Sequence, residues 1–106
     1  MIRIAASDSS AADRASADLV CNGSNDRTVI QKGWGRPNEK VQMLNGTYHV
    51  DCGSNGIDGN PYLYPAAGVI ITGGPGVILQ ATNGICRITV QHENVHISGL
   101  TCRGLS

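Results

Sequence analysis

The segment from Gly68 to Gly84, GVIITGGPGVILQATNG, limits the possible folds more than any other part of the sequence. Two aliphatic runs are separated by GGPG and followed by TNG. Because Gly and Pro interrupt the segment so often, it cannot form a helix of useful length. Runs this short and this apolar cannot be buried alone. The segment therefore predicts short strands that stack on other strands.

Composition supports a fold with many turns. The 106 residues include fourteen Gly and no Phe, which argues against a helical bundle. A chain of this length forms at most one domain with a thin core. The net charge is zero and no basic patch is interleaved with aromatic residues, so nucleic acid is not an expected partner. The sequence contains no apolar run long enough for a membrane span, and its start lacks the apolar region of a signal peptide.

Residues 1–37 are expected to form an N-terminal strand and capping helices. Residues 2–6 resemble a short strand, and near-helical spacing of apolar residues predicts a first helix at about residues 9–20. A second helix follows, with Ile30 and Trp34 on one face, and we expect Trp34 to plug the core.

Everything after Pro37 resembles strand and turn. Val41, Val69 and Val95 each open an apolar-alternating strand, and they lie 28 and then 26 residues apart. A period in the twenties is typical of a solenoid, in which each unit buries its apolar face on the next. A β-sandwich is the alternative, but the spacing favours the solenoid. The sequence thus predicts parallel rungs over residues 38–106, open at the C-terminal end. Six residues are expected in the stacked core: Val41, Met43, Val69, Ile71, Val95 and Ile97.

Four segments occur in an order that is similar to a known family: NDRTVIQKGW, VQMLNGTYHV, VIITGGPGVILQA and ENVHISGLTCRG. Together they resemble the N-terminal part of right-handed parallel β-helix proteins of the pectate-lyase-like superfamily. The residues before them resemble a lead-in found in phage and prokaryotic cell-surface proteins. The resemblance implies a mainly-β fold, a short β-helix of about three rungs behind an N-terminal capping helix or helices. Family catalytic groups lie on later rungs, so no catalytic residue is carried over to this chain.

Three patterns could carry chemistry, and a structural explanation is favoured for most of them. Asp51 and Asp58 bracket a Gly-rich loop that could bind Ca²⁺, but turn chemistry explains the same residues. His92, Glu93 and His96 lack the further ligand that a zinc site needs. The GGPG turn precedes a strand and not a helix, so it is not a phosphate-binding loop. We assign no catalytic, cofactor-binding or metal-binding residue and expect no cofactor.

Tyr62 and Tyr64 share one face of an extended segment. They could stack on sugar rings or form an oligomer contact. A small sugar-binding lectin would require both rings to be exposed and close together.

Cys21, Cys52, Cys86 and Cys102 fit no CxxC metal spacing. Two disulfides are possible, with Cys21–Cys52 as the first choice of pair. Mostly free thiols are favoured, because Cys86 and Cys102 occupy core-facing strand positions and can act as small apolar residues.

The predicted function is a non-enzymatic structural and binding module, and the resemblance implies an extracellular, cell-surface or virion assembly such as a phage tail. Expected partners are further copies, as a stacked filament or a trimer, or the remainder of a longer chain. A polysaccharide is a further candidate partner. The alternative function is an N-terminal non-catalytic fragment of a polysaccharide lyase or glycoside hydrolase.

Overall fold

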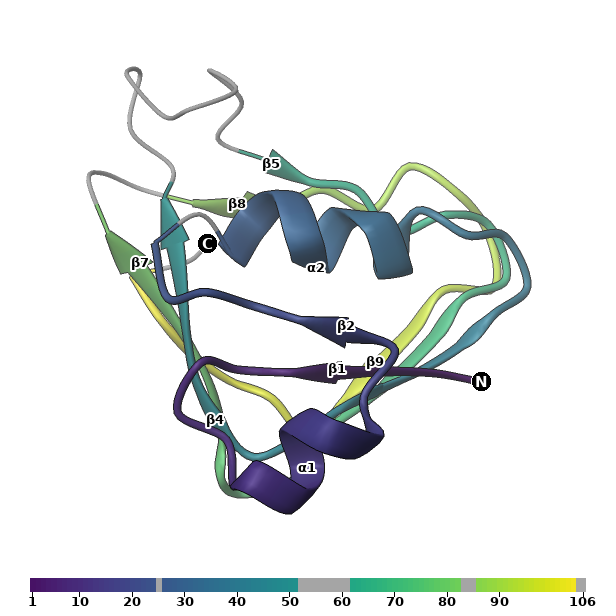
Figure 1. Ribbon diagram of the computed structural model, residues 1–106. Coiled ribbons are helices and arrows are strands. Elements are labelled where there is room, and N and C mark those ends of the chain that lie inside the picture. Colours follow the sequence, from purple (N-terminus) through teal and green to yellow (C-terminus); the bar gives the residue numbers. More distant parts are fainter. Residues whose placement is uncertain (25, 52–61, 83–85, 105–106) are drawn as a thin grey trace.

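The computed structural model describes four stretches of the chain: residues 1–24, 26–51, 62–82 and 86–104. Within them the chain forms two helices (Figure 1), α1 (Ala11–Ser16) and α2 (Asp26–Trp34). Short strands make up the rest of the regular structure: β1 (Ile2–Ala5), β2 (Leu19–Val20), β3 (Lys40–Met43), β4 (Gly46–Asp51), β5 (Tyr62–Leu63), β6 (Ile70–Thr72), β7 (Val77–Thr82), β8 (Arg87–Ile88), β9 (His96–Ser98) and β10 (Thr101–Arg103).

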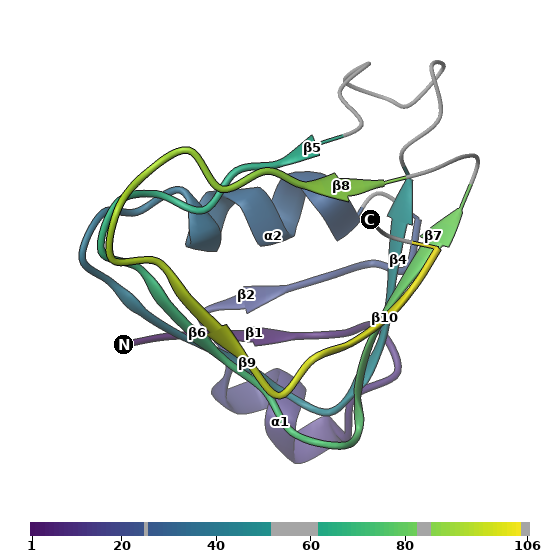
Figure 2. The ribbon, with the colours of Figure 1, turned by 180° about the vertical axis from the view of Figure 1, so that it is seen from behind.

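The strands form three sheets, and every strand pair in the described stretches is parallel. The largest sheet has the order β2-β1-β3-β6-β9, the second has the order β10-β7-β4, and the smallest pairs β5 with β8. The sheets and α2 surround one core (Figures 1 and 2). Because parallel strands cannot be joined by a tight hairpin, the chain passes through a helix or through other sheets before it returns to pair with an earlier strand.

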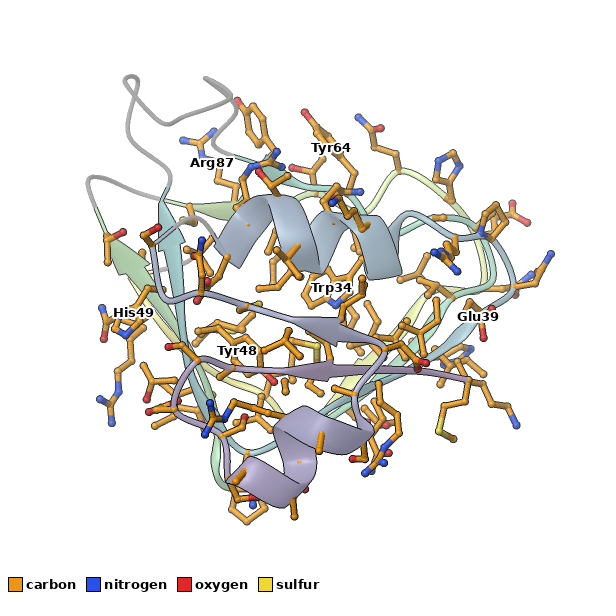
Figure 3. All side chains as sticks on the ribbon, in the orientation of Figure 1. Trp34, Glu39, Tyr48, His49, Tyr64 and Arg87 are labelled. Carbon is orange, nitrogen blue, oxygen red and sulfur yellow. The ribbon has the colours of Figure 1, made fainter. Side chains whose placement is uncertain are left out.

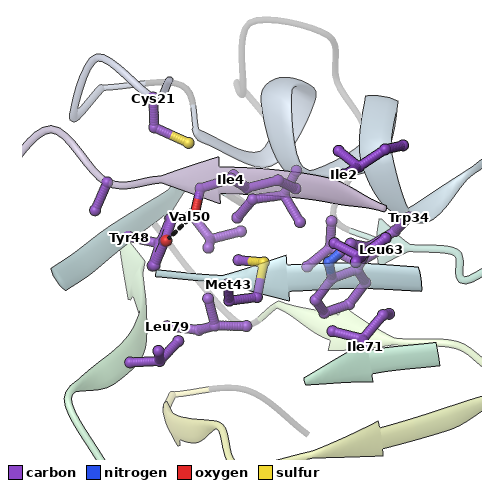
Figure 4. Close-up of a cluster of buried hydrophobic side chains, with 14 of the residues drawn as sticks. Ile2, Ile4, Cys21, Trp34, Met43, Tyr48, Val50, Leu63, Ile71 and Leu79 are labelled. Carbon is purple, nitrogen blue, oxygen red and sulfur yellow. Dashed lines mark hydrogen bonds between the residues drawn. The ribbon is translucent and has the colours of Figure 1, made fainter. Parts of the chain in front are cut away.

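Alternating burial explains where the strands form. In β3, Val41 and Met43 are buried while Lys40 is exposed, the period of two that a strand with one face on a core requires. Tyr48 of β4 is fully buried (Figure 4), and its hydroxyl donates to the carbonyl oxygens of Leu44 and Ile4 at 2.6 and 2.8 Å. The polar end of this side chain is therefore satisfied inside the core.

Helix α2 forms one wall of the core. Ile30 and Trp34 lie one turn apart, on one helix face, and both are fully buried. The indole of Trp34 points from the helix into the core (Figure 3). Helix α2 packs against β4 and β5. A Cβ at Gly33 would lie 2.7 Å from Cδ1 of Ile4, so this glycine allows the helix to approach β1 closely.

The predicted fold class, a mainly-β right-handed parallel β-helix of about three rungs, is wrong. The structure is a small α/β fold with two helices and several parallel sheets of unequal size. The physical reason lies in residues 1–37, which were expected to act only as a strand and a cap. There α2 buries two large side chains and completes the core beside the sheets, and β1 and β2 join the largest sheet. The described residues within 1–37 and within 38–106 accordingly contribute to one core.

The register of the largest sheet differs in one place from the predicted stacking. Val41 pairs with Ile71, two residues beyond the expected partner Val69. Ile71 pairs with Ile97, which keeps the spacing of 26 residues seen in the sequence. Val41, Met43, Val69 and Ile71 are buried, whereas Val95 and Ile97 are partly buried.

The first helix is shorter than predicted. It ends at Ser16, and Leu19 and Val20 form β2 beside β1. Asp18 accounts for the change, because its carboxylate accepts a hydrogen bond from the backbone N–H of Arg3 at 2.8 Å and holds this segment extended. Neither helix in the described stretches is long and apolar enough to cross a membrane.

Candidate functional site

In the largest sheet, one core-facing residue from each of β1, β3, β6 and β9 pairs with the next across neighbouring strands. The member in β9 is less buried than the others. Ile2, Val41, Ile71 and Ile97 form this series. The first three are at most 5% exposed, whereas Ile97 is only partly buried. The series therefore ends with a core-type side chain that has no described strand beside it on one side.

The other two sheets end in the same way. Tyr48 and Leu79 are fully buried, but Cys102, which pairs with Leu79 in β10, is exposed. Leu63 is fully buried, and its partner Ile88 in β8 is partly buried. We call the surface formed by β8, β9 and β10 the open end. Figure 2 views the molecule with β9 and β10 in front.

The open end also consists of edge strands. β8, β9 and β10 each pair with one neighbour, and no other described strand lies along their second side. An edge strand presents backbone N–H and C=O groups that can pair with another strand. Apolar side chains lie beside these edges: Val90 is 54% exposed, and Val95 and Leu100 are partly buried. This surface can therefore form both backbone hydrogen bonds and apolar contacts.

The opposite side of the molecule, which we call the closed end, consists of α1, α2, β2 and the outer edges of β4 and β5 (Figure 1). Two carboxylates occupy backbone donors of β4. Asp8 accepts from the N–H of Thr47 at 2.9 Å, and Asp26 accepts from the N–H of His49 at 2.7 Å. Asp26 is fully buried and also accepts from the N–H of Gly23 at 2.9 Å. This edge of β4 is thus already hydrogen-bonded.

Side chains of α2 occupy the edge of β5 and the residues after it. The Gln31 amide donates to the carbonyl oxygen of Tyr64 at 2.9 Å and accepts from its N–H at 2.8 Å. The Arg27 guanidinium donates to the carbonyl oxygen of Tyr62 at 2.7 Å. The helix therefore supplies the hydrogen bonds that a neighbouring strand would otherwise provide.

A polar groove of about 550 Å³ follows one corner of the molecule beside the open end. Three aligned residues before β3, β6 and β9 have positive φ: Asn38 (60°), Gly68 (74°) and Asn94 (62°). The groove is lined by Asn38, Ala67, Gly68, Ile70, His92, Glu93, Asn94 and His96. Three of these residues, His92, Glu93 and His96, were the metal-ligand candidates of the sequence analysis, and their side chains are exposed. In the part of the chain that the structure describes, no three His, Cys, Asp or Glu side chains are grouped to hold a metal.

Tyr62 and Tyr64 lie close together on the outside of the smallest sheet. Their ring centroids are 5.6 Å apart with planes inclined by 44°, and both side chains are half-buried. Arg87, exposed on β8, is the register partner of Tyr62 (Figure 3 labels Tyr64 and Arg87). The calcium candidate of Asp51 and Asp58 lies outside the described residues, since the side chain of Asp51 is not described either.

The cysteines differ in state. Cys21 is free and buried, so the predicted first choice, a Cys21–Cys52 disulfide, is wrong. Burial, with a smaller contribution from the nearby Asp26 carboxylate, raises the pKa of the Cys21 thiol far above its usual value. Cys86 is buried and disulfide-bonded, which corrects its expected role as a free apolar residue. Cys102 is free and exposed; its register position faces the core, but the described structure does not cover it.

The residues that close one end were not singled out in the sequence. Asp8, Asp26 and Gln31 are ordinary polar residues near helices, and no local pattern indicates that they bond to distant strands. Comparisons with models of protein families, with curated protein sequences and with solved structures gave no match to this chain. The geometry of the two ends is therefore the basis on which a function can be proposed.

Proposed function

We propose that this chain is a non-catalytic structural and binding module that joins a larger assembly through its open end. One observation carries the proposal: three series of core-facing residues lose cover on the same side, where Ile88 and Ile97 are only partly buried and Cys102 is exposed. Apolar surface beside edge strands is typical of a surface that another chain covers. The cover is supplied by partner strands, by further copies as a filament or trimer, or by the remainder of a longer chain.

We infer that the assembly lies outside the cell, on a cell surface or on a virion. The disulfide at Cys86 supports this location, because disulfides persist in oxidising compartments and are rare in the cytosol.

Sedimentation velocity over a range of protein concentrations tests the proposal with two matched lysine variants. Ile97→Lys places a charge at the open end, and Val20→Lys places one on β2 at the closed end, where Val20 is 45% exposed. We expect the native chain to self-associate as its concentration rises, Ile97→Lys to stay monomeric and Val20→Lys to behave like the native chain. A closed-end variant that alone loses association would contradict the proposal, and a native chain that stays monomeric throughout would exclude further copies as the cover.

A second candidate function is polysaccharide binding, as in a non-catalytic fragment of a polysaccharide lyase or glycoside hydrolase. The observation that favours it is the pair of neighbouring rings of Tyr62 and Tyr64, with Arg87 beside them. Aromatic rings can stack on the apolar faces of sugars, and an arginine would favour an acidic polysaccharide. Calorimetric titration with acidic and neutral oligosaccharides tests this. Binding that is weakened by both Tyr64→Ala and Arg87→Ala would support polysaccharide binding. No binding of any oligosaccharide would exclude this second function.

A further inference from the structure

We propose that the occupant of the open end is an extended segment of a partner polypeptide, which adds as parallel strands to β9 and β10 and places a glycine over Asn94. The inference rests on the proposed function and adds to it the kind of partner and its register. The expected segment has the pattern glycine, apolar, any residue, apolar. After a turn, a second strand with alternating apolar residues covers β10.

The direction of the added strand follows from continuity with the sheets. β9 adds to β6 in parallel, and β10 adds to β7 in parallel. On the β6 side, the N–H of His96 donates to Val69 at 3.0 Å, and the carbonyl oxygen of Ser98 accepts from Gly73 at 3.0 Å. Because successive backbone groups of a strand point to opposite sides, the N–H and C=O of Ile97 are directed to the open side. A parallel strand would pair with them as β9 pairs with β6.

The need for glycine follows from the corner that precedes each strand of the largest sheet. Asn38, Gly68 and Asn94 are aligned there, and all three have a left-handed backbone. A Cβ built on Gly68 would collide with Oδ1 of Asn38. Gly68 therefore tolerates its positive φ without strain and also leaves room for the asparagine side chain beside it. Asn94 has the same residue type and nearly the same φ as Asn38, so the segment that covers it needs a glycine at the matching position.

The apolar positions of the partner follow from the register. Val69 and Ile71 come one and three residues after Gly68, and Val95 and Ile97 come one and three residues after Asn94. An incoming segment in the same alignment buries Val95 and Ile97 with its first and third residues after glycine. Across the turn, its second strand covers Leu100 and Cys102, which align with Val77 and Leu79 of β7. The exposed side chains of His92, Glu93 and His96 then form a polar rim, as interfaces commonly have.

A second copy of this chain fits the open end less well. The β4 edge of its closed end is a poor partner for β10, because Asp8 and Asp26 already occupy the N–H groups of Thr47 and His49. Its open end would have to approach face to face about a two-fold axis, which pairs β9 with β9 antiparallel and does not repeat the parallel register of the sheet. Copies can therefore associate there only imperfectly, and a matched strand displaces them.

The chain itself supplies a suitable probe, the synthetic peptide GVIITGGPGVILQ (residues 68–80), which has the expected pattern and carries two added lysines for solubility. The matched control is the same peptide with Gly68→Ala, since an L-alanine at a positive φ is strained and its Cβ would meet Asn94. At a protein concentration low enough to keep the native chain monomeric, alkylation of the Cys102 thiol reports cover of the open end. Cys21 is the internal control because it is buried.

We expect the glycine peptide to slow alkylation of Cys102 at least tenfold at saturation, with no effect from the alanine peptide. Val20→Lys should keep this protection and Ile97→Lys should lose it. At high protein concentration the glycine peptide should also dissociate the self-associated chains into monomers, as measured by sedimentation velocity. Equal protection by both peptides, no protection by either, or a discrete dimer that the glycine peptide cannot displace would overturn the inference. Each of these results leaves the proposed function intact as long as Ile97→Lys abolishes association.

Discussion

The two ends of this molecule finish their sheets in different ways. At the closed end, side chains of Asp8, Asp26 and Gln31 bond to the backbone of outer strands, and α2 covers the core. At the open end, core-facing residues such as Ile97 are only partly covered, and strand edges have no described partner. A strand cannot add to a sheet edge whose backbone N–H and C=O groups are already hydrogen-bonded, but it can add to an edge where these groups are unpaired. On the function proposed above, this difference makes the open end the side at which other chains would add.

The largest expected effect compares two isoleucines in the same register series. Ile71→Ala removes a fully buried side chain and should lower the free energy of unfolding by about 2–5 kcal/mol. Ile97→Ala should cost less than half as much, because water already reaches part of that side chain. Urea denaturation followed by circular dichroism measures both values. Equal losses would show that Ile97 is as well covered as Ile71, and the distinction between the ends would fail.

The next effect concerns the buried carboxylate of the closed end. Asp26→Ala leaves the N–H groups of Gly23 and His49 without their acceptor and should cost roughly 1–3 kcal/mol. Hydrogen exchange at the His49 amide should become faster as well. Asp8→Ala is the matched control: Asp8 is exposed, so its loss should cost less. An unchanged exchange rate at His49 in Asp26→Ala would show that this carboxylate does not protect the edge of β4.

Sequence patterns predicted one of these ends better than the other. The alternation around Val69 and Ile71 placed short parallel strands, and the spacing of 26 residues matched the pairing of Ile71 with Ile97. The overall class was wrong because nothing in the local pattern of α2 distinguishes a helix that caps a core from one that forms its wall. That outcome depends on how deeply Trp34 is buried against distant strands.

The closed end could not be predicted for a similar reason. Asp26 accepts from His49, 23 residues away, and Gln31 bonds to Tyr64, 33 residues away. Polar side chains near a helix usually face water, so their type and spacing do not reveal a bond to a distant strand edge. Only the assembled register brings these groups together.

Alkaline pH should weaken the core beside the closed end by a smaller amount. Burial raises the pKa values of the Cys21 thiol and the Tyr48 hydroxyl in the folded chain. Between the ordinary and the raised pKa, the unfolded chain loses a proton that the folded chain keeps, so stability falls as pH rises. We expect the loss to begin near pH 9 for Cys21 and near pH 10 for Tyr48. Urea midpoints of Cys21→Ala and Tyr48→Phe, measured from about pH 7 to about pH 11, should each lack one part of the decline. A decline that neither variant reduces would assign it to other groups.

The smallest effect is expected from a surface ion pair. The N-terminal ammonium lies 3.1 Å from Glu39 and lowers the pKa of its carboxyl. A lowered pKa corresponds to a contribution that is present at neutral pH and lost as the carboxyl is protonated in acid, and for an exposed pair that contribution is too small to measure. Because water and salt screen this pair, Glu39→Gln should leave the urea midpoint at neutral pH unchanged. A clear shift would mean that surface charge, and not only buried hydrogen bonds, holds β1 beside β3.

The amide of Gln31 satisfies both the donor and the acceptor of one strand residue. A single side chain can therefore act as the terminus of a sheet, in the way that a cap terminates a polymer. A molecule with such a terminus on one side only has a built-in polarity. Any larger particle that contains it would be built outward from a fixed starting point, and its length would be set by the strands that add on the other side.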